Sequence, residues 1–119
     1  MNTNIEKVLT WVEAEELTGE YIVIPEGYTE IEDRAFEGRE DIIRVTIPDS
    51  MTVIGARAFY MCTSLVGIII PMGVKIIGDY AFSACRSLIT INVDPDNPNY
   101  SSEDGVLFNK DKAYTKLVD

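Results

Sequence analysis

A period of 23 residues runs through most of this chain and limits what it can fold into. Residues 19–41, 42–64 and 65–87 align without a gap. The shared columns are Ile24-Pro25, Ile47-Pro48 and Ile70-Pro71; Ile31, Ile54 and Ile77; and Ala35-Phe36, Ala58-Phe59 and Ala81-Phe82. A period of this length predicts a solenoid, in which each repeat packs only against its neighbours.

Each repeat predicts two strand-like segments and a bend. Val45 and Ile47 are two positions apart and so share one face of a strand, and the proline after them ends the pairing at the rim. The chain then turns back and buries Ile54 in a second line of side chains. Gly55 and the equivalent Gly78 follow, and we predict that each bends the chain with a positive φ angle.

The aligned columns also predict the core. The alanine fits where successive turns crowd, and the phenylalanine fills the centre, where each ring should stack on the ring one turn away. Turns of such a coil are about 4.8 Å apart. The predicted core residues are Ile24, Ile31, Phe36, Ile47, Ile54, Phe59, Ile70, Ile77 and Phe82.

The first strand of each repeat leaves an outward face, which is the predicted partner-binding surface. Ile68 and Ile70 align with the inward Val45 and Ile47, so Ile69 between them should point outward. Two columns make up this face: Tyr21, Arg44, Gly67 and Thr90, and beside them Val23, Thr46, Ile69 and Asn92. Because such a face is extended and no catalytic motif is visible, protein binding is the favoured function.

The segment "LVGIIIPMGVKIIGDYAFSAC" (65–85) resembles the 23-residue leucine-rich repeat of the BspA-like surface proteins, and the resemblance covers residues 19–118. It implies a mostly β fold, a short right-handed leucine-rich-repeat solenoid. It also implies a non-enzymatic protein-interaction module, with adhesion to host matrix proteins and a cell-surface or secreted location. The first repeat departs from the pattern, since Glu32 replaces the glycine of the other repeats and Arg39 replaces their cysteine, which is typical of a terminal repeat.

Residues 1–18 are predicted to cap the N-terminal end, because a solenoid exposes its core at both ends. A helix is favoured, with Asn2, Thr3 or Asn4 as its N-cap and Gly19 as its end. The alternating "VLTWV" (8–12) leaves a strand as the alternative. Trp11 is predicted to pack over the first repeat, with a ligand-binding tryptophan as the alternative. The apolar face of the helix would be Ile5, Val8, Leu9 and Val12.

Residues 88–119 are predicted to form a partial fourth repeat and a β-hairpin cap. The hairpin is expected in "GVLFNKDKAYTKLV" (105–118), where "NKDK" joins two apolar runs. The preceding loop, residues 94–105, is rich in the oxygen donors that calcium prefers, but Pro98 breaks the EF-hand spacing. We favour an Asx-rich turn. The oxygen donors are Asp94, Asp96, Asn97, Asn99, Glu103 and Asp104.

Composition argues against several classes of function. The net charge of −10 would repel a phosphate backbone, so no nucleic-acid partner is expected. No apolar run approaches the roughly 18 residues of a membrane span, and no membrane insertion is expected. No secretion signal opens the sequence, which favours a cytoplasmic protein or one whose signal has been removed. With no histidine and no catalytic or metal motif, we expect neither enzymatic activity nor a cofactor or metal.

Cys62 and Cys85 are 23 positions apart, so they should stack on adjacent turns at a distance that a disulfide can span. Free buried thiols are favoured over a disulfide, because the column needs only small apolar groups. A catalytic pair is not expected without a histidine or a CxxC motif.

Charge is unevenly distributed. Residues 1–41 carry 12 acidic and 3 basic side chains, whereas residues 42–119 carry 8 and 7. A solvated acidic face is the favoured interpretation, and a steering patch for a basic partner is the alternative. A structural role, as a slice of a longer solenoid or a homo-oligomer, is the alternative to binding another protein.

Overall fold

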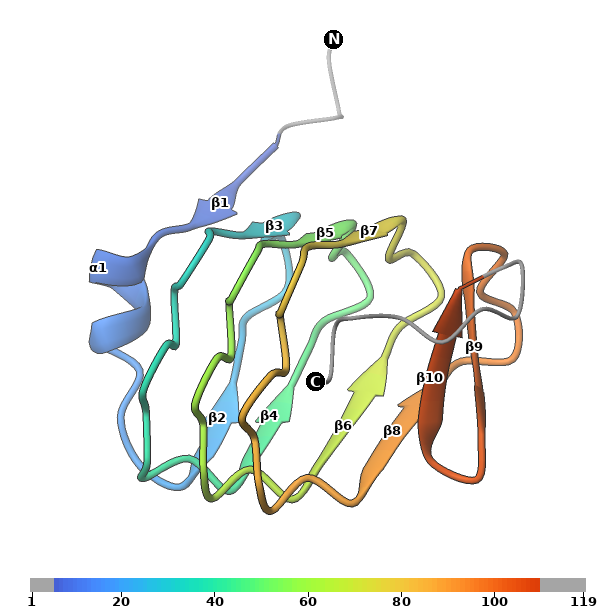
Figure 1. Ribbon diagram of the computed structural model, residues 1–119. Helices are drawn as coiled ribbons and strands as arrows, with labels where there is room; N and C mark the ends of the chain where they lie inside the picture. The colour runs from blue at the N-terminus through green and yellow to red at the C-terminus, as the bar shows by residue number, and fades with distance from the viewer. Residues whose placement is uncertain (1–5, 110–119) are drawn as a thin grey trace, which may run out of the picture.

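Each 23-residue repeat forms one turn of a coil, and successive turns stack along one axis (Figure 1). The computed structural model of the chain describes residues 6–109. Its elements in chain order are β1 (Val8–Leu9), α1 (Trp11–Glu15), β2 (Tyr21–Val23), β3 (Glu30–Ile31), β4 (Arg44–Thr46), β5 (Val53–Ile54), β6 (Gly67–Ile70), β7 (Ile76–Ile77), β8 (Thr90–Val93), β9 (Tyr100–Glu103) and β10 (Val106–Asn109).

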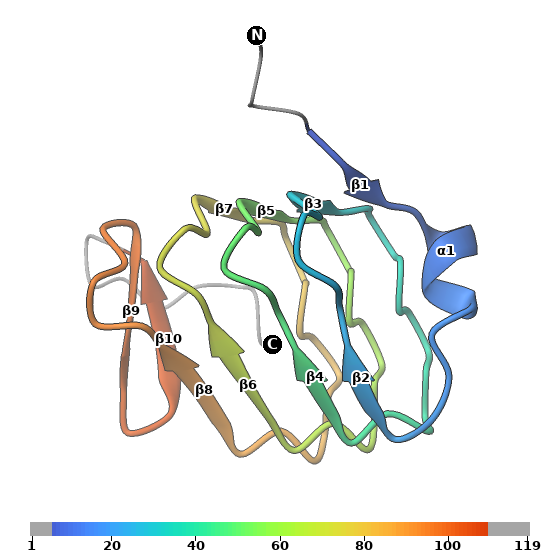
Figure 2. The same ribbon diagram turned by 180° about the vertical axis from the view of Figure 1, so that it is seen from behind.

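Two parallel sheets form two sides of the coil (Figure 2), one with the order β2-β4-β6-β8 and the other β1-β3-β5-β7. Partners on consecutive repeats are 23 positions apart, as in the pairing of Tyr21 with Arg44 and of Val53 with Ile76. The predicted mostly β leucine-rich-repeat solenoid is therefore confirmed. No helix within residues 6–109 is long and apolar enough to cross a membrane.

The core is a set of aligned columns in the interior of the coil. The rings of Phe36 and Phe59 are stacked with centroids 5.2 Å apart, and those of Phe59 and Phe82 with centroids 5.4 Å apart. Each spacing is close to the distance between turns, so every ring packs face to face on the next. The structure buries all nine residues that the alignment assigned to the core.

The role predicted for Gly55 and Gly78 is wrong. Neither has a positive φ angle, and residues such as Arg57 (φ 56°) and Tyr80 (φ 59°) adopt the left-handed conformation instead. The two glycines are required by close packing, because a Cβ added at Gly55 would lie 2.5 Å from the backbone nitrogen of Asp33. A Cβ added at Gly78 would meet the backbone of Ala56 at a still shorter distance. The glycine column therefore lets consecutive turns approach each other.

The described N-terminal cap consists of a short strand followed by a helix that is much shorter than predicted. Val8 and Leu9 form β1, which pairs with β3 and so satisfies backbone groups at the open edge of the sheet. The helix begins only after Thr10, which is its N-cap in a capping box with Glu13, and it ends at Glu15. The strand alternative is thus confirmed for Val8–Leu9.

Other parts of the cap prediction differ from the structure or lie outside it. The helix ends four residues before Gly19, so that glycine is not its immediate end. Trp11 is 52% exposed and does not pack over the first repeat as a core residue. The predicted N-cap residues Asn2, Thr3 and Asn4, and the apolar Ile5, lie outside the described residues.

The two departures of the first repeat from the pattern are contacts to this cap. Glu32 Oε1 accepts a hydrogen bond of 2.9 Å from the backbone N–H of Trp11. The Arg39 guanidinium donates to the carbonyls of Ala14 and Leu17 at 3.2 and 2.8 Å. Both side chains therefore bind backbone groups at the ends of a helix that has no counterpart in the later repeats.

A β-hairpin covers the C-terminal end, as expected, and the structure describes it in β9 and β10. These strands pair antiparallel, with their turn at Asp104-Gly105, whereas the turn predicted in "NKDK" (109–112) falls almost entirely outside the described residues. The second apolar run, residues 113–118, lies outside the described residues. Asp104 (φ 53°) and Gly105 (φ 79°) are both left-handed, as a tight hairpin turn requires. The hairpin binds β8, since Ile91 N–H donates to the Gly105 carbonyl at 2.9 Å.

Candidate protein-binding surface

The outer side of the sheet β2-β4-β6-β8 carries the residues predicted for partner binding. Strand alternation places Ile22, Val45, Ile68 and Ile91 inward and their neighbours outward. We call the outward set the sheet face. It comprises Tyr21, Val23, Arg44, Thr46, Gly67, Ile69, Thr90 and Asn92, and all except Gly67 are exposed.

Gly67 is buried and offers no side chain to a partner, unlike the other residues of this face. A Cβ added there would lie 3.1 Å from Thr90 Oγ1 and 3.5 Å from Arg44 Nη1, so its two neighbours cover it. The missing side chain leaves a depression of about 210 Å³ beside Arg44, Thr46 and Ile69. Gly67 therefore shapes the surface but cannot be a contact residue in the predicted sense.

The chemistry of the sheet face suits binding rather than catalysis. Tyr21, Val23 and Ile69 are 65%, 64% and 66% exposed, which leaves three large apolar side chains in solvent on one sheet. Arg44 contributes a guanidinium, and tyrosine and arginine are both enriched in protein interfaces. None of the eight residues is a carboxylate, a histidine or a cysteine, so the face holds no acid–base pair.

Ile89 was missed by the sequence analysis, although it is the most exposed large apolar residue among those described, at 77%. Its equivalents Ile43 and Val66 are half-buried. The repeat pattern therefore suggested a covered position. The relevant signal was that the fourth block breaks away after residue 94, so no regular turn follows Ile89.

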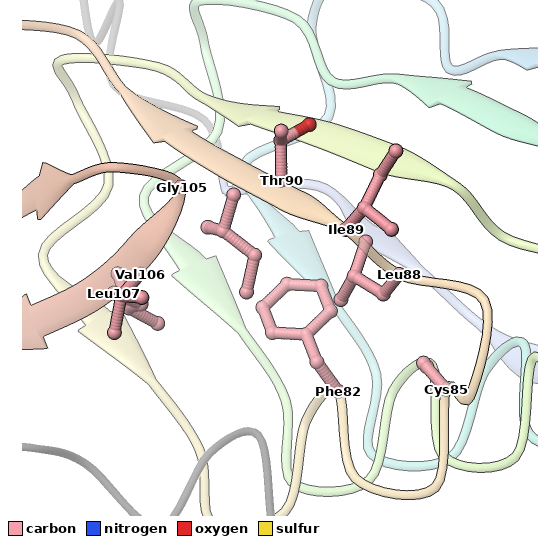
Figure 3. A pocket seen from close by; sticks show the side chains of 9 residues that line it. Phe82, Cys85, Leu88, Ile89, Thr90, Gly105, Val106 and Leu107 are labelled. Atoms are coloured by element: carbon pink, nitrogen blue, oxygen red, sulfur yellow. The ribbon is translucent and has the colours of Figure 1, made fainter.

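A small cavity lies beside Ile89, at the C-terminal end of the phenylalanine column (Figure 3). It has a volume of about 250 Å³, and its walls include Phe82 and Leu88 from the coil and Leu107 from β10. Gly105 is 23 positions after Phe82, so the ring column is not continued there. The cavity is thus the space between the last aromatic turn and the hairpin cap.

The acidic loop before the hairpin is an Asx-rich turn, as predicted. Asn97 is buried, and its Nδ2 donates to the carbonyls of Pro71 and Val74 at 2.9 and 3.1 Å. Its Oδ1 accepts from the backbone N–H groups of Asn99 and Tyr100. The amide of Asn97 therefore holds the loop against the third turn. No group of three or more histidine, cysteine or acidic side chains within residues 6–109 is placed to bind a metal ion.

A hydrogen bond between Tyr28 in the first turn and Glu13 in α1 shifts the pKa values of both side chains. Tyr28 Oη donates to Glu13 Oε2 at 2.7 Å, and this bond lowers the pKa of Glu13 and raises the pKa of Tyr28. Both shifts favour the ionised carboxylate beside a protonated phenol at neutral pH. The pair connects α1 to the first turn and lies outside the sheet face.

Both cysteines are free and buried, as favoured from the sequence. The Cys62 thiol donates to the Phe36 carbonyl and the Cys85 thiol to the Phe59 carbonyl, at 3.1 and 3.0 Å. Burial raises the pKa of Cys62 to about 12 and the pKa of Cys85 to about 11. The thiolate, which is the reactive form, is therefore disfavoured at neutral pH.

We expect the native protein to resist iodoacetamide at pH 8, because both thiols are buried and protonated. In urea, where the thiols are exposed and their pKa values return to normal, two additions are expected by mass spectrometry. A Cys62→Ala variant, which retains only Cys85, separates the two sites. Equal labelling rates with and without urea would contradict this prediction.

The stacked 23-residue turns, the parallel sheets and the phenylalanine column define a leucine-rich-repeat solenoid. The family model described as "BspA type Leucine rich repeat region (6 copies)" matches residues 15–110, and the chain belongs to this family. The resemblance found in the sequence is thereby confirmed. No protein with a curated description matches the chain.

Two solved structures are similar to the chain at the level of fold and sequence. A leucine-rich cell surface protein from Faecalibacterium prausnitzii A2-165 is 36% identical, with a TM-score of 0.73 over 83% of this chain and 25% of its own. The leucine-rich-repeat protein of T. pallidum is 37% identical, with a TM-score of 0.59 over 61% of this chain and 36% of its own. The chain thus spans about a quarter and a third of their lengths.

Proposed function

We propose that this chain is a non-enzymatic protein-binding module that uses the sheet face, and that its partner is a host matrix protein bound at the cell surface. Leucine-rich-repeat proteins are in general protein-interaction modules. The observation that carries the proposal is the exposure of Tyr21, Val23 and Ile69 around a guanidinium on a rigid sheet. The surface location is supported by the relative from F. prausnitzii, which is described as a cell surface protein.

The sheet face is tested by placing a charge at its centre. Ile69→Lys is expected to abolish binding to purified, immobilised matrix proteins, because an ammonium would have to be desolvated against an apolar contact. Unfolding should be nearly unaffected, with a change within about 0.5 kcal/mol, since Ile69 is 66% exposed. Surface plasmon resonance measures the first quantity and urea denaturation the second.

Ile76→Lys is the matched control for this variant. Ile76 is 56% exposed on β7, in the other sheet, and the substitution is chemically identical. The control should bind as the unmodified chain does. If both variants lose binding equally, or if none of the matrix proteins binds the unmodified chain, the proposal is wrong.

Assembly between copies of the chain is the second candidate, and the same exposed apolar residues favour it. It predicts a dimer whose dissociation on dilution is promoted by Ile69→Lys. Light scattering across a dilution series checks this, and a monomer at every concentration would exclude it.

A further inference from the structure

A groove lies at the N-terminal end of the solenoid, between residues of α1 and of the first and second turns. Figure 1 shows α1 beside the first turn at this end. Its volume is about 610 Å³, and none of the sheet-face residues lines it. Trp11 and Met61 contribute apolar side chains to its walls. Gly38 also lines the groove and has open space around it, since an added Cβ would meet no heavy atom within 4 Å.

The backbone that carries Trp11 is fixed beside this groove. Its backbone N–H is bound by Glu32, and the helix that carries it is fixed at the other end by Arg39. Trp11 is nevertheless 52% exposed, and Met61, which also lines the groove, is 42% exposed. An exposed tryptophan on a fixed stretch of backbone is the kind of residue that dominates protein interfaces.

The groove also has an acidic rim. Glu15, Asp33 and Glu37 line it. Of the two arginines that line it, Arg39 is engaged by Asp41 and by carbonyls of the cap, and Arg34 lies 3.9 Å from Glu37. The surrounding segment is strongly negative, since residues 1–41 carry 12 acidic and only 3 basic side chains. A cation entering the groove would therefore meet a favourable field.

We infer that this groove, the Trp11 groove, binds an arginine-containing segment of a basic protein. The aliphatic part of an arginine side chain packs on Trp11 and Met61, and the planar guanidinium stacks on the indole, which is the strongest cation–π partner. The carboxylates of Glu15 and Glu37 accept its N–H groups. Arginine fits better than lysine, because only its planar head both stacks on an indole and pairs with a carboxylate in two places.

The negative charge around the groove disfavours two other occupants, a second copy of this chain and nucleic acid. A second copy of this chain carries a net charge of −10, and nucleic acid is also negative, so either would be repelled from an acidic groove. The Trp11 groove and the sheet face are separate surfaces. The inference therefore stands independently of the function proposed for the sheet face.

The sole tryptophan of the chain is Trp11, so its fluorescence reports on this groove alone. The probe is a nonapeptide of alternating arginine and alanine. In the control peptide each arginine is replaced by citrulline, which has a similar shape but no charge. We expect a saturable change in Trp11 emission with the arginine peptide and none with the citrulline peptide. Raising the salt from about 50 to 300 mM should weaken binding, because the ion pairs at the rim are screened.

Three variants locate the site. The double variant Glu15→Gln and Glu37→Gln is expected to weaken binding about fivefold. The control Glu6→Gln and Glu20→Gln removes the same charge from the same acidic third but outside the groove, and it should bind within about twofold of the unmodified chain. Trp11→Ala, followed by calorimetry, should lose the interaction, whereas Ile69→Lys should retain it.

Each contrary result overturns the inference. An equal loss in the two double variants would show that binding depends only on overall charge. Heat of binding without a change in Trp11 emission would place the peptide elsewhere. Absence of both signals would show that the groove does not bind arginine.

Discussion

Replacing Phe59 with alanine is expected to lower the free energy of unfolding by about 3–5 kcal/mol, the range observed for large aromatic side chains removed from a core. Phe59 is fully buried, and its ring is stacked between those of Phe36 and Phe82. The cavity would lie at the centre of the coil, where the backbone turns on both sides are fixed by their sheets and cannot collapse into it. Urea denaturation followed by circular dichroism measures the loss.

Two further variants keep this prediction testable if Phe59→Ala does not fold. Phe59→Leu retains most of the volume and should cost about 1 kcal/mol through the lost ring stacking. Phe82→Ala should cost less than Phe59→Ala by about 1 kcal/mol, because Phe82 stacks on one ring and borders a cavity of about 250 Å³ on its other side. Equal losses at Phe59 and Phe82 would show that ring stacking contributes nothing.

The columns of the repeat could be predicted because one residue type recurs in one environment. Ile24, Ile47 and Ile70 occupy equivalent positions on consecutive turns, so each supplies evidence about the others. The exposure of Ile69 could be predicted in the same way. Its sequence neighbours Ile68 and Ile70 are buried, so the residue between them in the strand must point outward.

The ends could not be predicted in this way, because no second copy of an end exists within the chain. Val8–Leu9 has both helical and alternating character, and the available edge of β3, a tertiary feature, decides in favour of a strand. The β9–β10 hairpin, in contrast, has a local signal, since "Asp-Gly" at 104–105 strongly favours a tight turn.

The candidate site was only partly visible from sequence. The sheet-face columns follow from strand alternation. The covering of Gly67 does not, because it depends on the positions that the side chains of Thr90 and Arg44 take on the neighbouring turns. The Trp11 groove depends on residues from α1, the first turn and the second turn, which are brought together by the fold. The exposure of Trp11 could not be predicted, because it depends on the helix beginning at Trp11 itself, directly after the N-cap Thr10.

Gly78→Ala should be among the most damaging single-methyl changes in the described chain, at about 3 kcal/mol. The added Cβ would meet backbone atoms of Gly55 and Ala56 on the preceding turn, and backbone cannot move aside as a flexible side chain can. Relief would require separating two turns that are joined by the hydrogen bond from Gly78 N–H to the Ile54 carbonyl, 2.8 Å long. Thermal and urea unfolding both measure the effect.

Gly38→Ala distinguishes this crowding from the conformational cost of an added side chain. Gly38 has φ of 76° and no heavy atom within 4 Å of an added Cβ, so alanine there is strained only through its backbone. That strain should cost about 1 kcal/mol, the lower end of the range for a residue in the left-handed region. If turn-to-turn contact is what requires glycine at 78, Gly78→Ala must be the more damaging of the two. A larger loss at Gly38 would show that backbone conformation, and not the approach of successive turns, governs where this repeat needs glycine.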